Sequence, residues 1–229
     1  MKFNIKELKK LLYENGADII GVADLSSYRL EEDELKFGIS IGVKLPKDIV
    51  KSISNGPNIE YYNIYNDLNG KLDLLANICA KYLINCGYKA QPQTTLIVKE
   101  TSDFRTDVPH KTVAVKAGLG WIGKNALLVT DDYGSAIRLT SILTNMKIYS
   151  EQEVVNSKCG QCMICRNACP ANAILGKEWH EGIDRDDIYN PISCRTKARE
   201  LAFNSFSKII TLCGKCIEVC PYTRRYINS

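Results

Sequence analysis

Eight of the ten cysteines in this 229-residue chain gather in its last third. Four of them form the run Cys159-Gly-Gln-Cys162-Met-Ile-Cys165-Arg-Asn-Ala-Cys169-Pro170. A shorter run reads Cys213-Gly-Lys-Cys216-Ile-Glu-Val-Cys220-Pro221, and Cys194 stands alone between the two. Because closely spaced cysteine thiolates are ligands for soft transition metals, the sequence predicts a metal centre here.

The spacing of these cysteines distinguishes between metals. C-x2-C-x2-C-x3-C-P is the pattern that binds [4Fe-4S] clusters in bacterial ferredoxins, where the fourth cysteine ligates the other of two clusters. The second run lacks one cysteine of this pattern, and Cys194 can supply it. We therefore predict two [4Fe-4S] clusters, one ligated by Cys159, Cys162, Cys165 and Cys220 and the other by Cys169, Cys194, Cys213 and Cys216. Zinc bound by two C-x2-C pairs is the alternative, but zinc does not require two C-x3-C-P endings.

A glycine-rich segment, Ala117-Gly-Leu-Gly-Trp-Ile-Gly-Lys124, lies upstream of the cysteines. Its glycines match G-x-G-x-x-G, but a dinucleotide site would need a strand before it, a helix after it and an acid about 20 residues later. Here we expect a helix before and a strand after, with no acid around Leu143. Two interpretations stay open: a tight loop that needs backbone freedom, or a loop that closely approaches a flat cofactor, with Trp121 and Lys124 beside it.

The elements that must position these residues differ between the two parts of the chain. The first part alternates helical and strand patterns, which predicts an α/β domain at 1–152, whereas the cysteine-rich part predicts a ferredoxin-like domain at 153–229. The polar stretch 150–153 marks the boundary. We expect a helix capped by Asn4 and ended by Gly16, strands at 18–23, 38–43 and 94–98, a helix at 62–86, and a hairpin of 126–130 and 136–143. Cys79 and Cys86 fall on the long helix as small core residues.

Composition limits the class of protein. Hydrophobic residues make up 45% and charged residues 24% of the chain, as is ordinary for globular proteins, and the formal net charge of +4 is mild. The sequence shows neither a secretory signal nor an apolar stretch of about 18 residues. We therefore expect a cytoplasmic protein without a membrane span.

The glycine-rich segment and the cysteine arrangement together resemble the epoxyqueuosine reductase family. The shared features are Ala117-Gly-Leu-Gly-Trp-Ile-Gly-Lys124 and the four, one and three cysteines with two Cys-Pro endings. The resemblance implies an α/β cobalamin-binding domain followed by an α+β ferredoxin-like domain with two [4Fe-4S] clusters. It also implies that electrons pass through the clusters to cobalamin, which reduces an epoxide on a tRNA nucleoside. The residues expected beside the cofactor are Gly118, Gly120, Trp121, Gly123 and Lys124.

Two departures from the family pattern affect the expected substrate and proton donor. The aspartate that donates a proton in the family falls on Phe104, so Asp103, Asp107 and His110 are the candidate catalytic replacements. The sequence ends at Ser229, before the helical-repeat domain of full-length members, so we expect a short relative whose substrate is not identified.

The leading hypothesis is an iron–sulfur oxidoreductase served by a low-potential donor of the ferredoxin or flavodoxin type. Its partner would be tRNA or a corrinoid protein. The alternatives are a ferredoxin-type electron carrier, or an activator that reduces a separate corrinoid protein and catalyses nothing else. A carrier needs only the cluster-binding segment, so the large N-terminal domain favours the enzyme.

Overall fold

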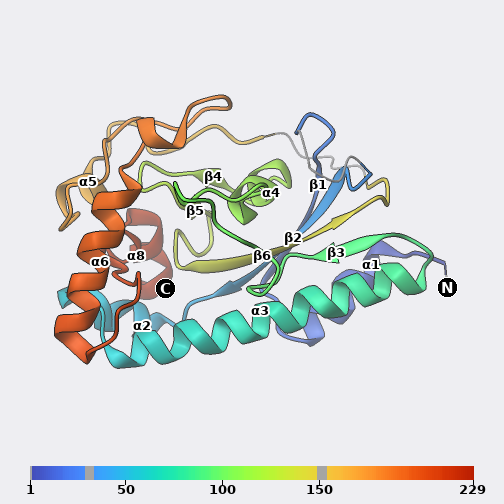
Figure 1. Ribbon diagram of the computed structural model, residues 1–229, viewed down its shortest axis with the longest axis horizontal. Coiled ribbons are helices and arrows are strands. Elements are labelled where there is room, and N and C mark those ends of the chain that lie inside the picture. The colour runs from blue at the N-terminus through green and yellow to red at the C-terminus, as the bar shows by residue number, and fades with distance from the viewer. Residues whose placement is uncertain (1, 29–33, 149–153) are drawn as a thin grey trace. The chain divides into compact units, whose positions relative to one another are not determined.

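A computed structural model describes residues 2–28, 34–148 and 154–229 (Figure 1). The chain divides into two compact units, each built from three separate segments. The sheet unit comprises the described residues of Met1–Val43, Leu68–Leu119 and Arg138–Val155, and the cysteine unit comprises Lys44–Asp67, Gly120–Ile137 and Asn156–Ser229. The predicted domain boundary at residues 152 and 153 lies outside the described residues. The cysteine unit also includes two segments that precede that boundary.

The sheet unit is built on four strands in the order β1-β2-β6-β3. β1 pairs antiparallel with β2, and β3 pairs antiparallel with β6. The elements of this unit are α1 (Ile5–Glu14), β1 (Ile19–Asp24), β2 (Phe37–Lys44), the later part of α3 (Ile59–Asn85), β3 (Ala90–Pro92), α4 (His110–Lys116) and β6 (Ile137–Thr144).

Local sequence signals explain where α1 begins and how it packs. The Asn4 side chain accepts a hydrogen bond from the backbone amide of Lys6 at 3.0 Å, which caps the helix. Leu8 and Leu12, one turn apart, are both fully buried. The predicted helix from Asn4 to Gly16 is therefore confirmed, and so are the strands that correspond to β1 and β2.

Alternation along the strands gives the sheet an apolar core on each face. Ile20 and Ile142 belong to the core formed with α1 and α3, whereas Ala23 and Leu143 belong to the core formed with α4. Figure 1 shows the α1 and α3 helices on one side of the sheet and α4 on the other. Cys79 on α3 is fully buried in the first core, as expected for a small core residue.

The predicted strand at 94–98 is wrong. The backbone amides of Ile97 and Val98 both donate to the carbonyl of Thr94, at 3.0 Å each, so the segment forms a helical turn. Thr95 strengthens this turn, since its amide donates to Asp73 at 2.9 Å. β-branched composition suggested a strand, but strand propensity depends on context, and these local hydrogen bonds decide otherwise.

The cysteine unit consists of short helices and one small two-stranded sheet. Its elements are α2 (Lys47–Ser52), η1 (Ile53–Asn55), the first part of α3, β4 (Trp121–Ile122), β5 (Leu128–Val129), α5 (Ile164–Asn167), η2 (Arg185–Asp187), α6 (Pro191–Phe206), α7 (Lys215–Glu218) and α8 (Pro221–Asn228). The α2 helix packs against α7 and α8, and α5 packs against α7. Pro191 and Pro221 each occupy the first turn of a helix, where the missing amide costs nothing.

The predicted hairpin at 126–143 is only partly correct. Thr130 and Gly134 exchange two backbone hydrogen bonds of 3.0 Å, so the turn between the segments forms as expected. However, β5 pairs with β4, whereas β6 joins the larger sheet. Within the described residues, no helix is both long enough and apolar enough to cross a membrane.

Candidate metal centre

The structure brings Cys220 from the second motif to the thiols of the first. The pKa of Cys165 is raised to about 11, first by burial and then by the neighbouring thiols of Cys159, Cys220 and Cys162, in that order of strength. These electrostatic effects require the other three thiols to lie close to Cys165. This set is the predicted ligand set of one cluster.

The remaining four cysteines form a second group. Burial raises the pKa of Cys194, with further contributions from Cys169 and Cys213. Burial also raises the pKa of Cys216, which has Cys213, Cys194, Cys165 and Cys169 as electrostatic neighbours. Because Cys165 belongs to the first group, the two groups adjoin, as electron transfer between two clusters requires.

These surroundings suit iron–sulfur clusters. Burial and crowding make the bare thiolates costly, and binding to iron replaces the proton on each sulfur with a cation. The backbone amide of Ala173 donates to the Cys169 Sγ at 3.3 Å, a contact that also tunes cluster potentials. The residues therefore fit two clusters of four thiolates each.

The glycine-rich segment supports the cysteine loops from within the cysteine unit. Lys124 is 3% exposed, and its Nζ donates to the carbonyl of Gly160 at 2.6 Å. The Asn125 Nδ2 donates to the carbonyl of Cys216 at 3.3 Å and to the Ser135 Oγ at 2.9 Å. Adjacent residues thus bind one loop from each cysteine motif. Asn125 is not among the residues predicted from the sequence, where its only signal is its position beside Lys124.

The Trp121 side chain also packs against residues of the cysteine motifs. Its ring is fully buried and contacts the Tyr222 ring edge-to-face, with centroids 4.8 Å apart. The Lys158 Nζ lies 4.9 Å from the centroid of the Trp121 ring. Tyr222 and Lys158 are near neighbours in sequence of Cys220 and Cys159, so Trp121 packs between the ends of the two motifs.

The three glycines of this segment are explained by contacts within the chain. A Cβ on Gly120 would lie 2.1 Å from the carbonyl oxygen of Val129, and one on Gly123 would lie 2.7 Å from both the Asn125 Oδ1 and the Val129 Cγ2. Gly118 has a φ of 69° and directly follows the C-cap of α4, the usual left-handed position after a helix.

Most of the residues predicted to contact cobalamin are buried within the protein. Gly120, Trp121, Gly123 and Lys124 are buried by protein, so they present little surface to a large flat ligand. They fit a role as scaffold for the cysteine loops better than a role in binding a corrin. Of the five predicted cofactor residues, only Gly118 is partly exposed.

The candidate catalytic residues lie in the sheet unit. The His110 Nδ1 is 2.7 Å from the Ser141 Oγ, and burial lowers the pKa of His110 to about 4, with Arg138 adding to the effect. The Asp103 carboxylate pairs with Arg105 at 2.8 Å, and a hydrogen bond from Thr101 is the main cause of its lowered pKa. At neutral pH His110 is therefore uncharged and Asp103 is an ionised carboxylate. Asp107 is exposed.

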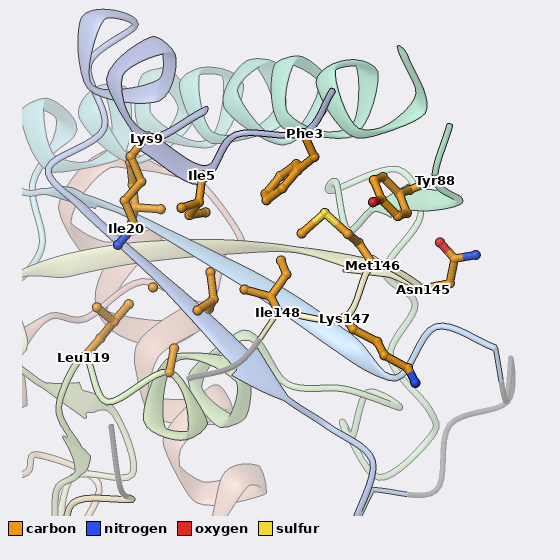
Figure 2. Close-up of a pocket in the computed structure, with 13 residues that line it drawn as sticks. Phe3, Ile5, Lys9, Ile20, Tyr88, Leu119, Asn145, Met146, Lys147 and Ile148 are labelled. Carbon is orange, nitrogen blue, oxygen red and sulfur yellow. The ribbon is translucent and has the colours of Figure 1, made fainter. Parts of the chain in front are cut away.

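An open cavity of about 910 Å³ lies in the sheet unit, along β1 (Figure 2). Its lining is mostly apolar, with the amino groups of Lys9 and Lys147 toward opposite ends. The volume falls within the range of small-molecule sites. Its lining consists of Phe3, Ile5, Lys9, Ile20, Gly21, Val22, Tyr88, Ala117, Leu119, Asn145, Met146, Lys147 and Ile148. No predicted catalytic residue lines it.

Comparison with known proteins decides between iron–sulfur and zinc chemistry. Residues 158–223 match the 4Fe-4S double cluster binding domain. An epoxyqueuosine reductase of Lactococcus garvieae is 30% identical over the whole chain, which spans 63% of that relative's length. The chain is a relative of the epoxyqueuosine reductases. This relationship confirms the predicted resemblance and the two clusters.

Solved structures show that the likeness to epoxyqueuosine reductases extends to the fold. An epoxyqueuosine reductase in complex with an epoxyqueuosine-modified tRNA-Tyr stem loop matches 96% of this chain and 65% of its own, with a TM-score of 0.60 and 20% identity. A reductive dehalogenase, described with a mechanism for B12-dependent dehalogenation, matches 96% of this chain and 33% of its own, with a TM-score of 0.70 and 19% identity. The predicted α/β domain followed by a two-cluster ferredoxin-like domain is confirmed as a fold class.

Proposed function

We propose that this chain is an iron–sulfur oxidoreductase of the epoxyqueuosine reductase type. It takes single electrons from a low-potential donor of the ferredoxin or flavodoxin class and passes them through two [4Fe-4S] clusters to an acceptor. The observation that carries this proposal is the pair of adjoining thiol groups, in which Cys216 neighbours Cys165. Two adjoining clusters provide a conducting path, and neither cluster alone does so.

The proposed acceptor is a cobalamin, and the proposed final substrate is an epoxide on a tRNA nucleoside. Both assignments rest on the similar structures, one of which is a complex with an epoxyqueuosine-modified tRNA stem loop and another of which is described with B12-dependent dehalogenation. When bound, cobalamin would supply a cobalt centre that is reduced one electron at a time. Asp103, Asp107 and His110 stay the predicted catalytic residues.

Titration of hydroxocobalamin into anaerobic protein tests this function. Binding should change the corrin absorbance with a Kd of tens of micromolar or tighter, and chemically reduced clusters should then reduce the bound cobalt. A matched sample without clusters, prepared by iron chelation, should not transfer electrons. Cobalamin binding without electron transfer would contradict the conducting role of the clusters.

A second candidate is an activator or carrier that delivers electrons to a separate corrinoid protein. The burial of Trp121 and Lys124 within the cysteine unit favours it, because the predicted cofactor loop offers little surface to a corrin. Absence of hydroxocobalamin binding at tens of micromolar, with both clusters present and reducible, would select this function over the first.

A further inference from the structure

Lys124 is a buried cation placed at the loop of the first cysteine motif. Its Nζ donates to the carbonyl of Gly160 at 2.6 Å and lies 3.9 Å from the Met163 Sδ. Gly160 and Met163 are interspersed among Cys159, Cys162 and Cys165, the ligands predicted for the first cluster. The ammonium therefore faces the peptide that wraps this cluster.

The charge of Lys124 has no carboxylate to balance it in the described part of the chain. Other cations of the cysteine unit differ: Lys158 pairs with Asp131 at 2.9 Å, and Lys215 pairs with the buried Glu218 at 3.0 Å. Burying an ammonium group without a counter-charge is costly. A [4Fe-4S] cluster with four thiolates is an anion, so it can supply that counter-charge once assembled.

A cation beside a cluster acts differently on its two redox states. Reduction adds one electron to the cluster, and the extra negative charge is stabilised more strongly when a positive charge is held nearby in a poorly hydrated place. Net charge and hydrogen bonding around the cluster are recognised determinants of its potential. The buried position of Lys124 also protects its effect from screening by salt.

We propose that Lys124 sets the reduction potential of the cluster bound by Cys159, Cys162, Cys165 and Cys220, by holding a positive charge against its loop. This inference rests on the two-cluster part of the proposed function and is independent of the acceptor. Lys124 raises the potential of this cluster relative to what its thiolates alone would give.

Redox titration of the anaerobic full-length protein, followed by electron paramagnetic resonance, tests the proposal. Lys124→Gln keeps an amide donor for the Gly160 carbonyl but removes the charge, and Lys124→Arg keeps the charge. We expect Lys124→Gln to lower the equilibrium constant for reduction of one cluster at least tenfold, which is 59 mV for one electron. The potential of this cluster in Lys124→Arg should stay near the wild-type value. The potential of the second cluster should change little in both variants.

Lys158→Gln is the matched control. It also removes a cation close to Cys159, but the Lys158 side chain is 45% exposed and already paired with Asp131. Its effect on the potential should be less than threefold and should weaken as salt is added, whereas the effect of Lys124→Gln should persist in salt.

Iron analysis of the same samples makes each outcome decisive. Loss of the first cluster in Lys124→Gln but not in Lys124→Arg would support a role for the positive charge of Lys124 at this cluster. Loss in both variants would show that Lys124 acts only through its fit and would overturn the proposal. Full iron content with an unchanged potential in Lys124→Gln would also overturn the proposal. So would a potential in Lys124→Arg as low as that in Lys124→Gln.

Discussion

Cys220 lies in the second cysteine motif of the sequence but among the thiols of the first. Its thiol adds to the raised pKa of Cys165, together with those of Cys159 and Cys162. Cys194, alone in the sequence, has Cys169 and Cys213 as its thiol neighbours. The two motifs thus exchange ligands, which ties the C-terminal end of the chain to the first cluster.

Removing one ligand should therefore damage the cluster of the other motif. Cys220→Ala should lose the cluster held by Cys159, Cys162 and Cys165, so iron should fall to about four per chain. Cys194→Ala should lose the other cluster. The electron paramagnetic resonance spectrum of its remaining reduced cluster should therefore differ from that of Cys220→Ala. Cys86→Ala, in the turn that follows α3, serves as the control and should keep about eight irons. Identical spectra from the two ligand variants would refute the pairing.

His110 should make the sheet unit less stable in acid. Burial lowers its pKa from 6.5 to about 4, so the folded chain binds this proton less readily than the unfolded chain. The stability that depends on neutral His110 is complete above pH 6.5 and is lost as the pH falls toward 4. The full loss is on the order of 3 kcal/mol.

Hydrogen exchange of peptides from α4, corrected for the intrinsic effect of pH, measures this loss. Wild type should lose protection between pH 6.5 and 4. His110→Gln, which keeps a partner for Ser141 but does not titrate, should lose much less. Parallel curves for the two proteins would show that His110 does not carry the effect.

At the scale of elements, the small β4–β5 sheet links the glycine-rich segment to the cysteine loops. Trp121 pairs with Val129 across this sheet, and Lys124 and Asn125 lie within three residues of the end of β4. The carbonyl of Val129 occupies the space that a side chain at Gly120 would need. The position of Lys124 therefore depends on a glycine four residues earlier.

Gly120→Ala should weaken the cysteine unit. The added Cβ would meet backbone that has no flexible end to move, and overpacking of this kind costs about 1–3 kcal/mol or more. The measurement is the rate at which cluster absorbance is lost in urea, which should rise several-fold. Gly70→Ala on α3 is the control: a Cβ there meets nothing within 4 Å, and the helix should gain up to about 1 kcal/mol. Equal rates of cluster loss in Gly120→Ala and Gly70→Ala would argue against crowding of residue 120 by the Val129 carbonyl.

Much of the fold and of the metal centre could be predicted from sequence because the signals were local. Capping by Asn4, the short apolar run at 19–23 and the cysteine spacings each fix a short stretch of chain. The partners of β5 and β6 depend on distant segments, so the hairpin prediction captured the turn but not the pairing. The burial of Lys124 could not be inferred either, since it results from packing against a loop 36 residues away.

At the scale of the whole molecule, neither compact unit is continuous in sequence. The cysteine unit takes Lys44–Asp67 and Gly120–Ile137 as well as the C-terminal segment. Within this unit, the Tyr226 hydroxyl donates to the carbonyl of Leu45 at 2.8 Å, and the Lys215 Nζ donates to that of Ser54 at 2.8 Å. Segments far upstream of the cysteines therefore help to fix the helices that follow them.

A fragment of residues 154–229 should consequently bind its clusters poorly. It retains all eight ligands but lacks α2, β4 and β5, together with Lys124 and Asn125. Reconstituted under the same anaerobic conditions as the full chain, it should hold less than half as much iron or lose it far faster. A fragment with full iron content and the stability of the full chain would show that the upstream segments are dispensable.

Metal and sulfide analysis of the anaerobically purified chain tests the central claim most directly. Two four-iron clusters require about eight irons and about eight acid-labile sulfides per chain, with only trace zinc. Stoichiometric zinc without labile sulfide would contradict the account, because the eight cysteines would then hold single metal ions that conduct no electrons.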